Sequence, residues 1–132
     1  MKRKDMIFVF GSNLSGIHGA GAADYALKQR GAKWGAGEGL MGTCYALPTK
    51  GLNISFMSLG DVYESIQRFL KYADDNLNAT FMVTQVGCGL GGFTKEEIAP
   101  LFGQSAKEGS NLRFDTEWKD LLPSTAQFWG TF

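Results

Sequence analysis

The chain has 132 residues, and its 13 basic and 13 acidic side chains cancel to a formal net charge of zero. This length predicts one domain over residues 1–132, and the balanced charge argues against a strongly basic protein that tracks nucleic-acid phosphates. No apolar run reaches the ~18–20 residues of a membrane span, so we expect a cytoplasmic protein with no membrane partner. Cys44 and Cys88 form no CxxC motif and have no histidine at ligand spacing, so we expect no metal and no cofactor.

The N-terminal part reads as a strand, a glycine-rich turn and a helix. Met6–Phe10 is apolar and predicts a strand, and Gly11–Gly21 is rich in glycine. Ala22–Arg30 has a helical apolar face, and Gly31 stands where a helix commonly ends. A glycine turn followed by a helix N-terminus is a common site for phosphate groups.

The next segment, Gly31–Gly42, contains five glycines, and the first of them, Gly31, also stands at the predicted helix end. We expect an irregular, mobile loop, with disorder as the alternative. Trp34, Glu38, Leu40 and Met41 are the side chains that could cover a ligand, and Glu38 is the loop's candidate general acid.

Two further elements follow this loop. Thr43–Leu47 predicts a strand that ends at Pro48, because proline cannot donate to a sheet ladder. Thr49–Lys50 therefore falls at a carboxyl strand end, where open α/β sheets bind ligands. Asp61–Ala73 has a helical apolar stripe, with Asp61 as the predicted cap.

A second strand, glycine turn and helix occupies the centre of the chain. Phe81–Val86 predicts a buried strand, and Gly87–Gly92 holds four glycines within six positions. Thr94 predicts a helix cap, with Glu97 completing a capping box, and Pro100 should break or restart the helix 95–103. Two such turns in one small domain suggest a ligand with two phosphates, or with a phosphate and a sugar.

The C-terminal part is described by weaker signals. Leu112–Asp115 predicts an edge strand and Glu117–Leu122 a short helix. The aromatic tail Phe128–Phe132 either packs on the domain or forms a partner surface. Alternating strands and helices together predict a three-layer α/β/α fold with a mostly parallel central sheet.

Two familiar nucleotide-binding motifs do not fit the sequence. The pattern GxxxxGK[ST] is absent, which argues against a P-loop NTPase. Gly16, Gly19 and Gly21 have the dinucleotide fingerprint's spacing reversed, and they begin well after the predicted strand. A Rossmann dehydrogenase is therefore only weakly supported.

The chain resembles the macrodomains, which bind ADP-ribose, through three stretches that occur in the family's order. These are Asn13 with His18–Ala23, Pro48-Thr49-Lys50, and Val86–Gly92 (VGCGLGG). The closest likeness is to the branch of ADP-ribosyl glycohydrolases with a catalytic lysine, which includes antitoxins of DNA ADP-ribosyltransferases. The chain is also similar to small macrodomain-like proteins of phages. The resemblance spans roughly residues 6–102 and implies a macrodomain-like fold.

The resemblance implies a set of site residues. Lys50 matches the catalytic lysine, whose neutral amine attacks the anomeric carbon, so the site must favour the uncharged form by burial or a nearby cation. The implied ligand contacts are Asn13, His18, Gly19, Ala20, Gly21 and Ala22 on one side, and Gly87, Cys88, Gly89, Leu90, Gly91, Gly92 and Phe93 on the other.

Several of these residues also have plain structural interpretations. A histidine such as His18 more often occupies a turn than acts as a base, and Cys88 is better interpreted as a small packed side chain. Asn13 could hydrogen-bond to the backbone of the turn. The chain also departs from the branch, since Gly91 stands where some members have an assisting aspartate. Asp5 is a poor substitute for the family's adenine-binding aspartate.

Three hypotheses follow. The first is an ADP-ribosyl glycohydrolase whose partner is ADP-ribose or an ADP-ribosylated substrate, with Lys50 at the reacting carbon. The second is a non-catalytic module that binds or sequesters ADP-ribose or a derived nucleotide. The third is a protein-interaction domain that uses Phe128–Phe132.

Overall fold

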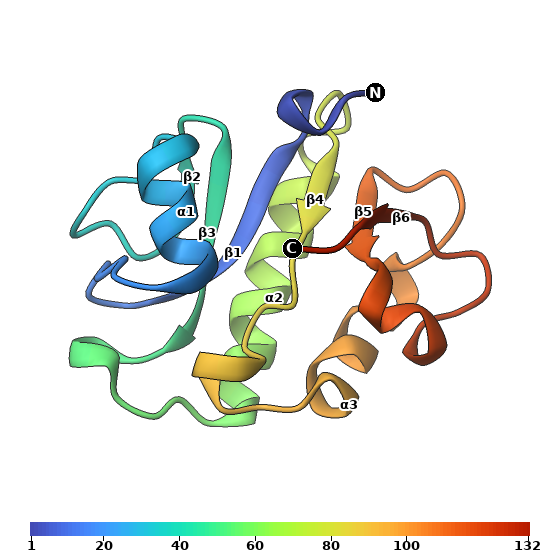
Figure 1. Cartoon of the computed structure of the whole chain (residues 1–132). Coiled ribbons are helices and arrows are strands. Elements are labelled where there is room, and N and C mark those ends of the chain that lie inside the picture. The colour runs from blue at the N-terminus through green and yellow to red at the C-terminus, as the bar shows by residue number, and fades with distance from the viewer.

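The computed structural model describes residues 1–132 and arranges them in three layers around a six-stranded sheet (Figure 1). The strand order is β2-β3-β1-β4-β5-β6. Every neighbouring pair is parallel except β2 and β3, which are antiparallel. The expected α/β class with a mostly parallel sheet is therefore confirmed, while a sheet of this kind does not assign a family.

The elements follow one another along the chain in alternating order. The strands are β1 (Ile7–Asn13), β2 (Gly39–Met41), β3 (Cys44–Lys50), β4 (Phe81–Val83), β5 (Leu112–Asp115) and β6 (Phe128–Gly130). The α-helices are α1 (Gly21–Gln29), α2 (Leu59–Asp74) and α3 (Lys95–Ile98). Short 3-10 segments are η1 (Arg3–Asp5), η2 (Leu52–Ile54), η3 (Gly89–Gly91), η4 (Ala99–Ser105) and η5 (Thr116–Leu121). No helix combines the length and apolar character needed to cross a membrane.

The sheet has a separate apolar core on each face, because successive side chains of a strand point in opposite directions. On β1, Val9 belongs to the core under α2, whereas Phe8 and Phe10 belong to the core under α1. Figure 1 shows α1 and α2 on opposite faces of the sheet. The α2 core is the larger and includes Phe69 and Trp118, both fully buried.

The first strand is longer than the sequence predicts. Gly11–Asn13 belongs to β1 rather than to the glycine turn, because β3 pairs with it as far as Lys50. The helix α1 lies close to its predicted range, and Gly31 after it has a φ of +83°, which favours glycine.

The prediction that Pro48 ends the second strand is wrong. Pro48 lies inside β3 and pairs with Ser12 of β1. The antiparallel partner β2 reaches only to Ala46, so the outer side of β3 has no partner at Pro48. Because no strand lies beside β3 at this point, the absence of an N–H on Pro48 removes no hydrogen bond from that side of the sheet.

The predicted N-cap of α3 is confirmed, whereas the predicted N-cap of α2 lies one helical turn after the observed one. Ser58, not Asp61, caps α2, and its Oγ accepts a hydrogen bond from the Asp61 N–H at 3.1 Å. Thr94 caps α3 with the predicted capping box. The helix ends at Ile98, and the chain continues through Pro100 as the 3-10 segment η4.

The C-terminal elements extend the sheet. β4 ends at Val83 rather than at Val86, and β5 is not an edge strand because β6 pairs beside it. The aromatic tail is packed, since its Phe128–Gly130 part is β6 and the Trp129 indole N–H donates to the Val83 carbonyl at 3.0 Å.

The prediction that Gly31–Gly42 is irregular holds for residues 31–38, which contain no helix or strand, and is wrong for its last part. Its last part forms the edge strand β2, and its middle packs on the turn after β1. The Gly35 N–H donates to the Gly16 carbonyl at 2.9 Å, and the Ser12 hydroxyl donates to the Gly37 carbonyl. The segment therefore braces the first glycine turn.

The packing of this segment leaves no room for a side chain at position 37. A Cβ added there would clash with the carbonyl oxygen of Asn13 and the backbone of Leu14, although the Gly37 backbone is one that alanine adopts. We therefore predict that Gly37→Ala lowers the free energy of unfolding by about 1–3 kcal/mol, measured by urea denaturation.

Gly103→Ala is the matched control, because no atom lies within 4 Å of an added Cβ at Gly103. We expect this control to unfold like the wild-type protein. Equal unfolding midpoints for Gly37→Ala and wild type would contradict the bracing role of the segment.

Candidate functional site

The site lies at the carboxyl edge of the sheet, where β1, β3 and β4 end side by side. Two cavities of about 260 Å³ and about 360 Å³ open there. They share lining residues and therefore lie side by side along this edge, and we call the two together the trough; the shared residues are Gly11, Ala20, Ala23, Thr49, Leu90 and Gly91. A trough of this size is typical of a small-molecule site.

One wall of the trough is the start of α1. Ala20 precedes the helix without a side-chain cap, so the first N–H groups of α1 have no partner from a capping side chain. Gly21 has a φ of +58° and lines the trough together with Ala22. This wall offers N–H groups and the positive end of a helix dipole to an anion.

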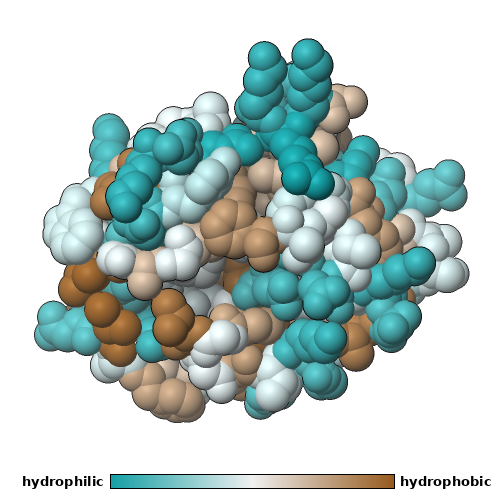
Figure 2. All heavy atoms as spheres, in the orientation of Figure 1, coloured by the Kyte–Doolittle hydropathy of each residue, from teal (hydrophilic) through white to brown (hydrophobic).

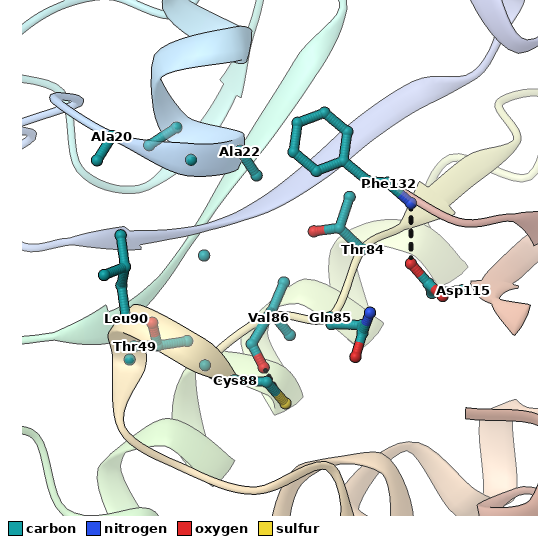
Figure 3. Close-up of a pocket in the computed structure, with 15 residues that line it drawn as sticks. Ala20, Ala22, Thr49, Thr84, Gln85, Val86, Cys88, Leu90, Asp115 and Phe132 are labelled. Atoms are coloured by element: carbon teal, nitrogen blue, oxygen red, sulfur yellow. Dashed lines mark hydrogen bonds between the residues drawn. The ribbon is translucent and has the colours of Figure 1, made fainter. Parts of the chain in front are cut away.

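The opposite wall is the glycine turn after β4. Its 3-10 segment η3 also begins without a side-chain cap, at Cys88. A Cβ added to Gly21 would lie 3.9 Å from Leu90 Cδ1, so the two walls approach closely. Figure 3 shows Ala20 and Ala22 on one side of the gap and Leu90 and Cys88 on the other.

The predicted helix start at Thr94 does not serve this wall. The Thr94 N–H donates to Glu97 Oε1 at 2.9 Å, and the Glu97 N–H donates to Thr94 Oγ1 at 3.2 Å. The capping box thus occupies these donors with the helix's own side chains. Residues of the turn itself, rather than of α3, line the trough.

Lys50 lies at one end of the trough. It is half-buried at the end of β3, is paired in the sheet with Asn13, and lines the wider cavity together with Ile54. None of the ion pairs in the structure involves Lys50. Lys50 therefore borders the cavity from the end of β3 and forms no ion pair with a carboxylate.

Asn13 lines the same cavity and also orders the turn after β1. Its Nδ2 donates to the Ile17 carbonyl at 2.8 Å, and its Oδ1 accepts from the Ile17 N–H at 3.0 Å. Both the structural and the ligand-binding interpretations fit, because the amide keeps one donor and one acceptor site for a further partner.

The structure does not bring His18 to the trough. Its side chain is fully buried, lies edge-on to Phe10 with ring centroids 5.4 Å apart, and lines neither cavity. Its Nε2 lies 3.0 Å from the Ala36 carbonyl oxygen, so this nitrogen carries the proton and donates. His18 therefore helps to fix the bracing segment to the first glycine turn.

The remaining predicted contacts divide into two groups. Those that line the trough are Gly19, Ala20, Gly21, Ala22, Gly87, Cys88, Leu90 and Gly91. Gly89 and Gly92 do not line it but shape the turn through φ values of +73° and +87°. Phe93 packs towards the α2 core, with its ring 6.2 Å from Phe56.

Glu38 is also remote from the trough. Its carboxylate accepts a hydrogen bond from Arg68 Nε at 2.7 Å and lines neither cavity. This hydrogen bond raises the pKa of Arg68 above its usual value. The suggestion that Glu38 acts as a general acid is therefore not supported by its position.

Sequence reasoning missed the other end of the trough, which is formed by Thr84, Gln85, Asp115 and Phe132 (Figure 3). Asp115 is fully buried at the end of β5. A strand end carrying an aspartate is a signal that could have found it. No local pattern marks Phe132, which the pairing of β6 with β5 brings to the trough.

Asp115 and Phe132 support each other. Asp115 Oδ1 accepts from the Glu117 N–H at 2.9 Å, while Oδ2 accepts from Thr131 Oγ1 at 3.1 Å and from the Phe132 N–H at 3.2 Å. The Phe132 ring packs against Phe8 and remains about half exposed. An aromatic face and a hydrogen-bond acceptor thus stand together at this end.

Asp5 lies in η1, ahead of β1 and at the opposite edge of the sheet from the trough. It therefore cannot take the place of a base-binding aspartate.

No group of three or more His, Cys, Asp or Glu side chains is placed to hold a metal ion. The chain matches no protein family, no curated protein and no solved structure in comparisons with known proteins.

The environment of Cys88 decides its reactivity. Burial, together with Glu96 and Glu97 nearby, raises the pKa of the Cys88 thiol to about 11. Since the ordinary pKa of a cysteine thiol is 9.0, Cys88 carries about a hundredfold less thiolate at pH 8 than an ordinary cysteine. The interpretation of Cys88 as a packed side chain agrees with this environment.

We predict that Cys88 in a Cys44→Ala variant is alkylated by iodoacetamide at pH 8 about a hundredfold more slowly when folded than when unfolded in urea. The rate should rise about tenfold per pH unit towards pH 11. A rate that levels off below pH 9 would instead reveal an activated thiolate.

Proposed function

We propose that the protein is a macrodomain-like ADP-ribose-binding protein that hydrolyses an ADP-ribosyl glycosidic bond. The observation that carries this proposal is the single trough, with two uncapped backbone walls in the middle and Lys50 at one end. Backbone N–H groups suit a diphosphate, because they supply donors without needing cationic side chains.

The two ends of the trough suit the two ends of such a ligand. Asn13 and Lys50 provide an amide and an amine beside the wider cavity, where the distal ribose would lie. Phe132 and Asp115 provide an aromatic face and an acceptor at the other end, where the base would lie. The ligand would therefore run along the carboxyl edge of the sheet.

Lys50 is the proposed nucleophile. Its neutral amine would attack the anomeric carbon of the distal ribose while the bond from that carbon to the acceptor breaks. The acceptor would take the proton that the amine gives up on bonding to the carbon. Water would then displace the amine, with its hydroxyl bonding to the carbon and its proton returning to the amine, and ADP-ribose would be released. The acceptor would leave through the mouth of the cavity that Lys50 and Ile54 line.

The second candidate is a module that binds ADP-ribose without hydrolysing it. It is favoured by Gly91, which lines both cavities and supplies no carboxylate. Lys50 also has no carboxylate partner in an ion pair. The third hypothesis, a partner surface made by Phe128–Phe132, loses support because β6 is packed in the sheet.

Calorimetric titration tests the ligand and a Lys50→Ala variant tests the chemistry. We predict micromolar affinity for ADP-ribose and at least about tenfold weaker binding of AMP, because AMP spans only part of the trough. Lys50→Ala should still bind ADP-ribose within a few-fold but lose about a hundredfold or more of its turnover of ADP-ribosylated substrates.

Three outcomes would count against these statements. The absence of heat with either nucleotide would remove ADP-ribose as the ligand. Turnover by Lys50→Ala equal to that of the wild type would exclude Lys50 as the nucleophile while leaving the binding site in place. Normal ADP-ribose binding with no turnover by the wild type would select the binding module.

A second substitution separates the catalytic and non-catalytic candidates. A Cβ added to Gly91 would meet Thr49 Oγ1 at 3.6 Å, an ordinary contact, and the Gly91 backbone is not in the left-handed region. An aspartate therefore fits there and adds a carboxylate to the cavity that holds Lys50.

We predict that Gly91→Asp raises the rate of ADP-ribose release about tenfold if Lys50 is catalytic, because a carboxylate can orient or deprotonate a reacting group. Single-turnover release of ADP-ribose is the measurement. Gly103→Asp, remote from the trough, is the control and should match the wild type. Loss of release in Gly91→Asp would argue that the proposed geometry is wrong.

A further inference from the structure

Exposed apolar side chains gather around the Lys50 end of the trough. The group, which we call the apolar rim, consists of Leu14, Leu52, Ile54, Phe56 and Leu90. These are five of the eleven large hydrophobic side chains that the chain exposes, and Phe56 is 81% exposed. Such a concentration at one place marks an interaction surface more often than chance exposure does.

Contacts place three of the five rim residues at this end, and Leu52 and Phe56 flank Ile54 in the chain. Ile54 and Leu90 line the cavity that contains Lys50, from different segments of the chain. The Leu14 N–H donates to the Lys50 carbonyl at 3.0 Å. Figure 2 shows brown side chains at the lower left, where Figure 1 has η2 and η3.

The segment that presents the apolar rim has a costly backbone. Asn53 and Ile54 have φ values of 54° and 61°, in the left-handed region. This region is unfavourable for a β-branched residue. The Asn53 N–H is fixed by Ser15 Oγ at 2.8 Å, and Ile54 is turned to the mouth of the cavity instead of a core. Strain of this kind is concentrated at functional sites.

The charge around the mouth distinguishes the classes of partner. Lys50 is the only cationic residue among those that line the trough and the apolar rim. A nucleic-acid strand needs several cations for its phosphates and aromatic faces for its bases. Four of the five rim side chains are aliphatic, and these pack against other apolar side chains.

We propose that the apolar rim docks a polypeptide, so that the substrate is an ADP-ribosylated protein with apolar side chains flanking the modified residue. This inference rests on the proposed function, because an acceptor bonded to the carbon at Lys50 must pass the rim on leaving the cavity. Hydrolysis breaks the bond between that carbon and the acceptor. Water supplies hydroxyl to the ribose and a proton to the acceptor.

The test compares probes and variants in the full chain. The probes are free ADP-ribose, an ADP-ribosylated peptide with leucine and phenylalanine flanks, the same peptide with serine flanks, and an ADP-ribosylated single-stranded oligonucleotide. The variants are Leu52→Ser/Phe56→Ser and, as the control, Leu77→Ser. Leu77 is 72% exposed, lies after α2 and lines neither cavity of the trough.

We expect the apolar-flanked peptide to bind about tenfold or more tightly than either free ADP-ribose or the serine-flanked peptide. Leu52→Ser/Phe56→Ser should remove this gain and leave the affinity for free ADP-ribose unchanged, while Leu77→Ser should change neither. Affinity is measured by titration on a timescale too short for turnover, or as KM where turnover is fast.

Four outcomes would overturn the inference. Equal affinity for the two peptides, preference for the oligonucleotide, and insensitivity to Leu52→Ser/Phe56→Ser each exclude polypeptide docking on the rim. A wild-type dimer in light scattering that the double variant dissociates would assign the rim to a second copy. Failure of free ADP-ribose to bind would remove the proposed function itself, and is thereby distinguished from the other outcomes.

Discussion

The trough depends on the close approach of three backbone segments at Gly11. This residue lies in β1, and a Cβ added to it would be 3.2 Å from the Gly87 nitrogen and 3.3 Å from Thr49 Oγ1. Both distances are tighter than ordinary van der Waals contact. Gly11 is therefore needed for space rather than for an unusual φ. Because it lines both cavities, its bare backbone is the floor over which a ligand can extend from one end of the trough to the other.

Local signals in the sequence predicted most elements, whereas long-range pairing decided the errors. Apolar runs and capping residues identified the start of α3 and both bounds of β5, whereas the predicted helix 95–103 continues after Ile98 as a 3-10 segment. Pro48 was misread because its effect depends on which side of β3 has a partner, and that follows from where β2 stops. Gly31–Gly42 was misread because two of its features depend on long-range contacts: Gly37 packs on Asn13 and Leu14, and Gly39–Met41 pairs with β3.

The candidate site was predictable to the same extent. Two glycine turns after parallel strands must lie at one sheet edge, so Gly21 and Gly91 could be expected to face each other. His18 lies between such residues in the chain, yet the turn directs its ring into the α1 core beside Phe10. Phe132 was beyond prediction, since it reaches the trough only because β6 adds to the sheet next to β5.

The distribution of charge gives the trough a direction. Lys50 supplies a basic group at one end, Asp115 supplies an acidic group at the other, and the walls between them are backbone and small side chains. A phosphate near Asp115 would meet a carboxyl group that is fully buried and already accepts three hydrogen bonds. Repulsion in such a poorly solvated place is strong, so the anionic part of a ligand is held in the middle or towards Lys50. The end beside Asp115 and Phe132 then suits a neutral aromatic group with a hydrogen-bond donor. Under the proposed function, ADP-ribose would bind in one orientation, with the base beside Phe132 and the distal ribose beside Lys50.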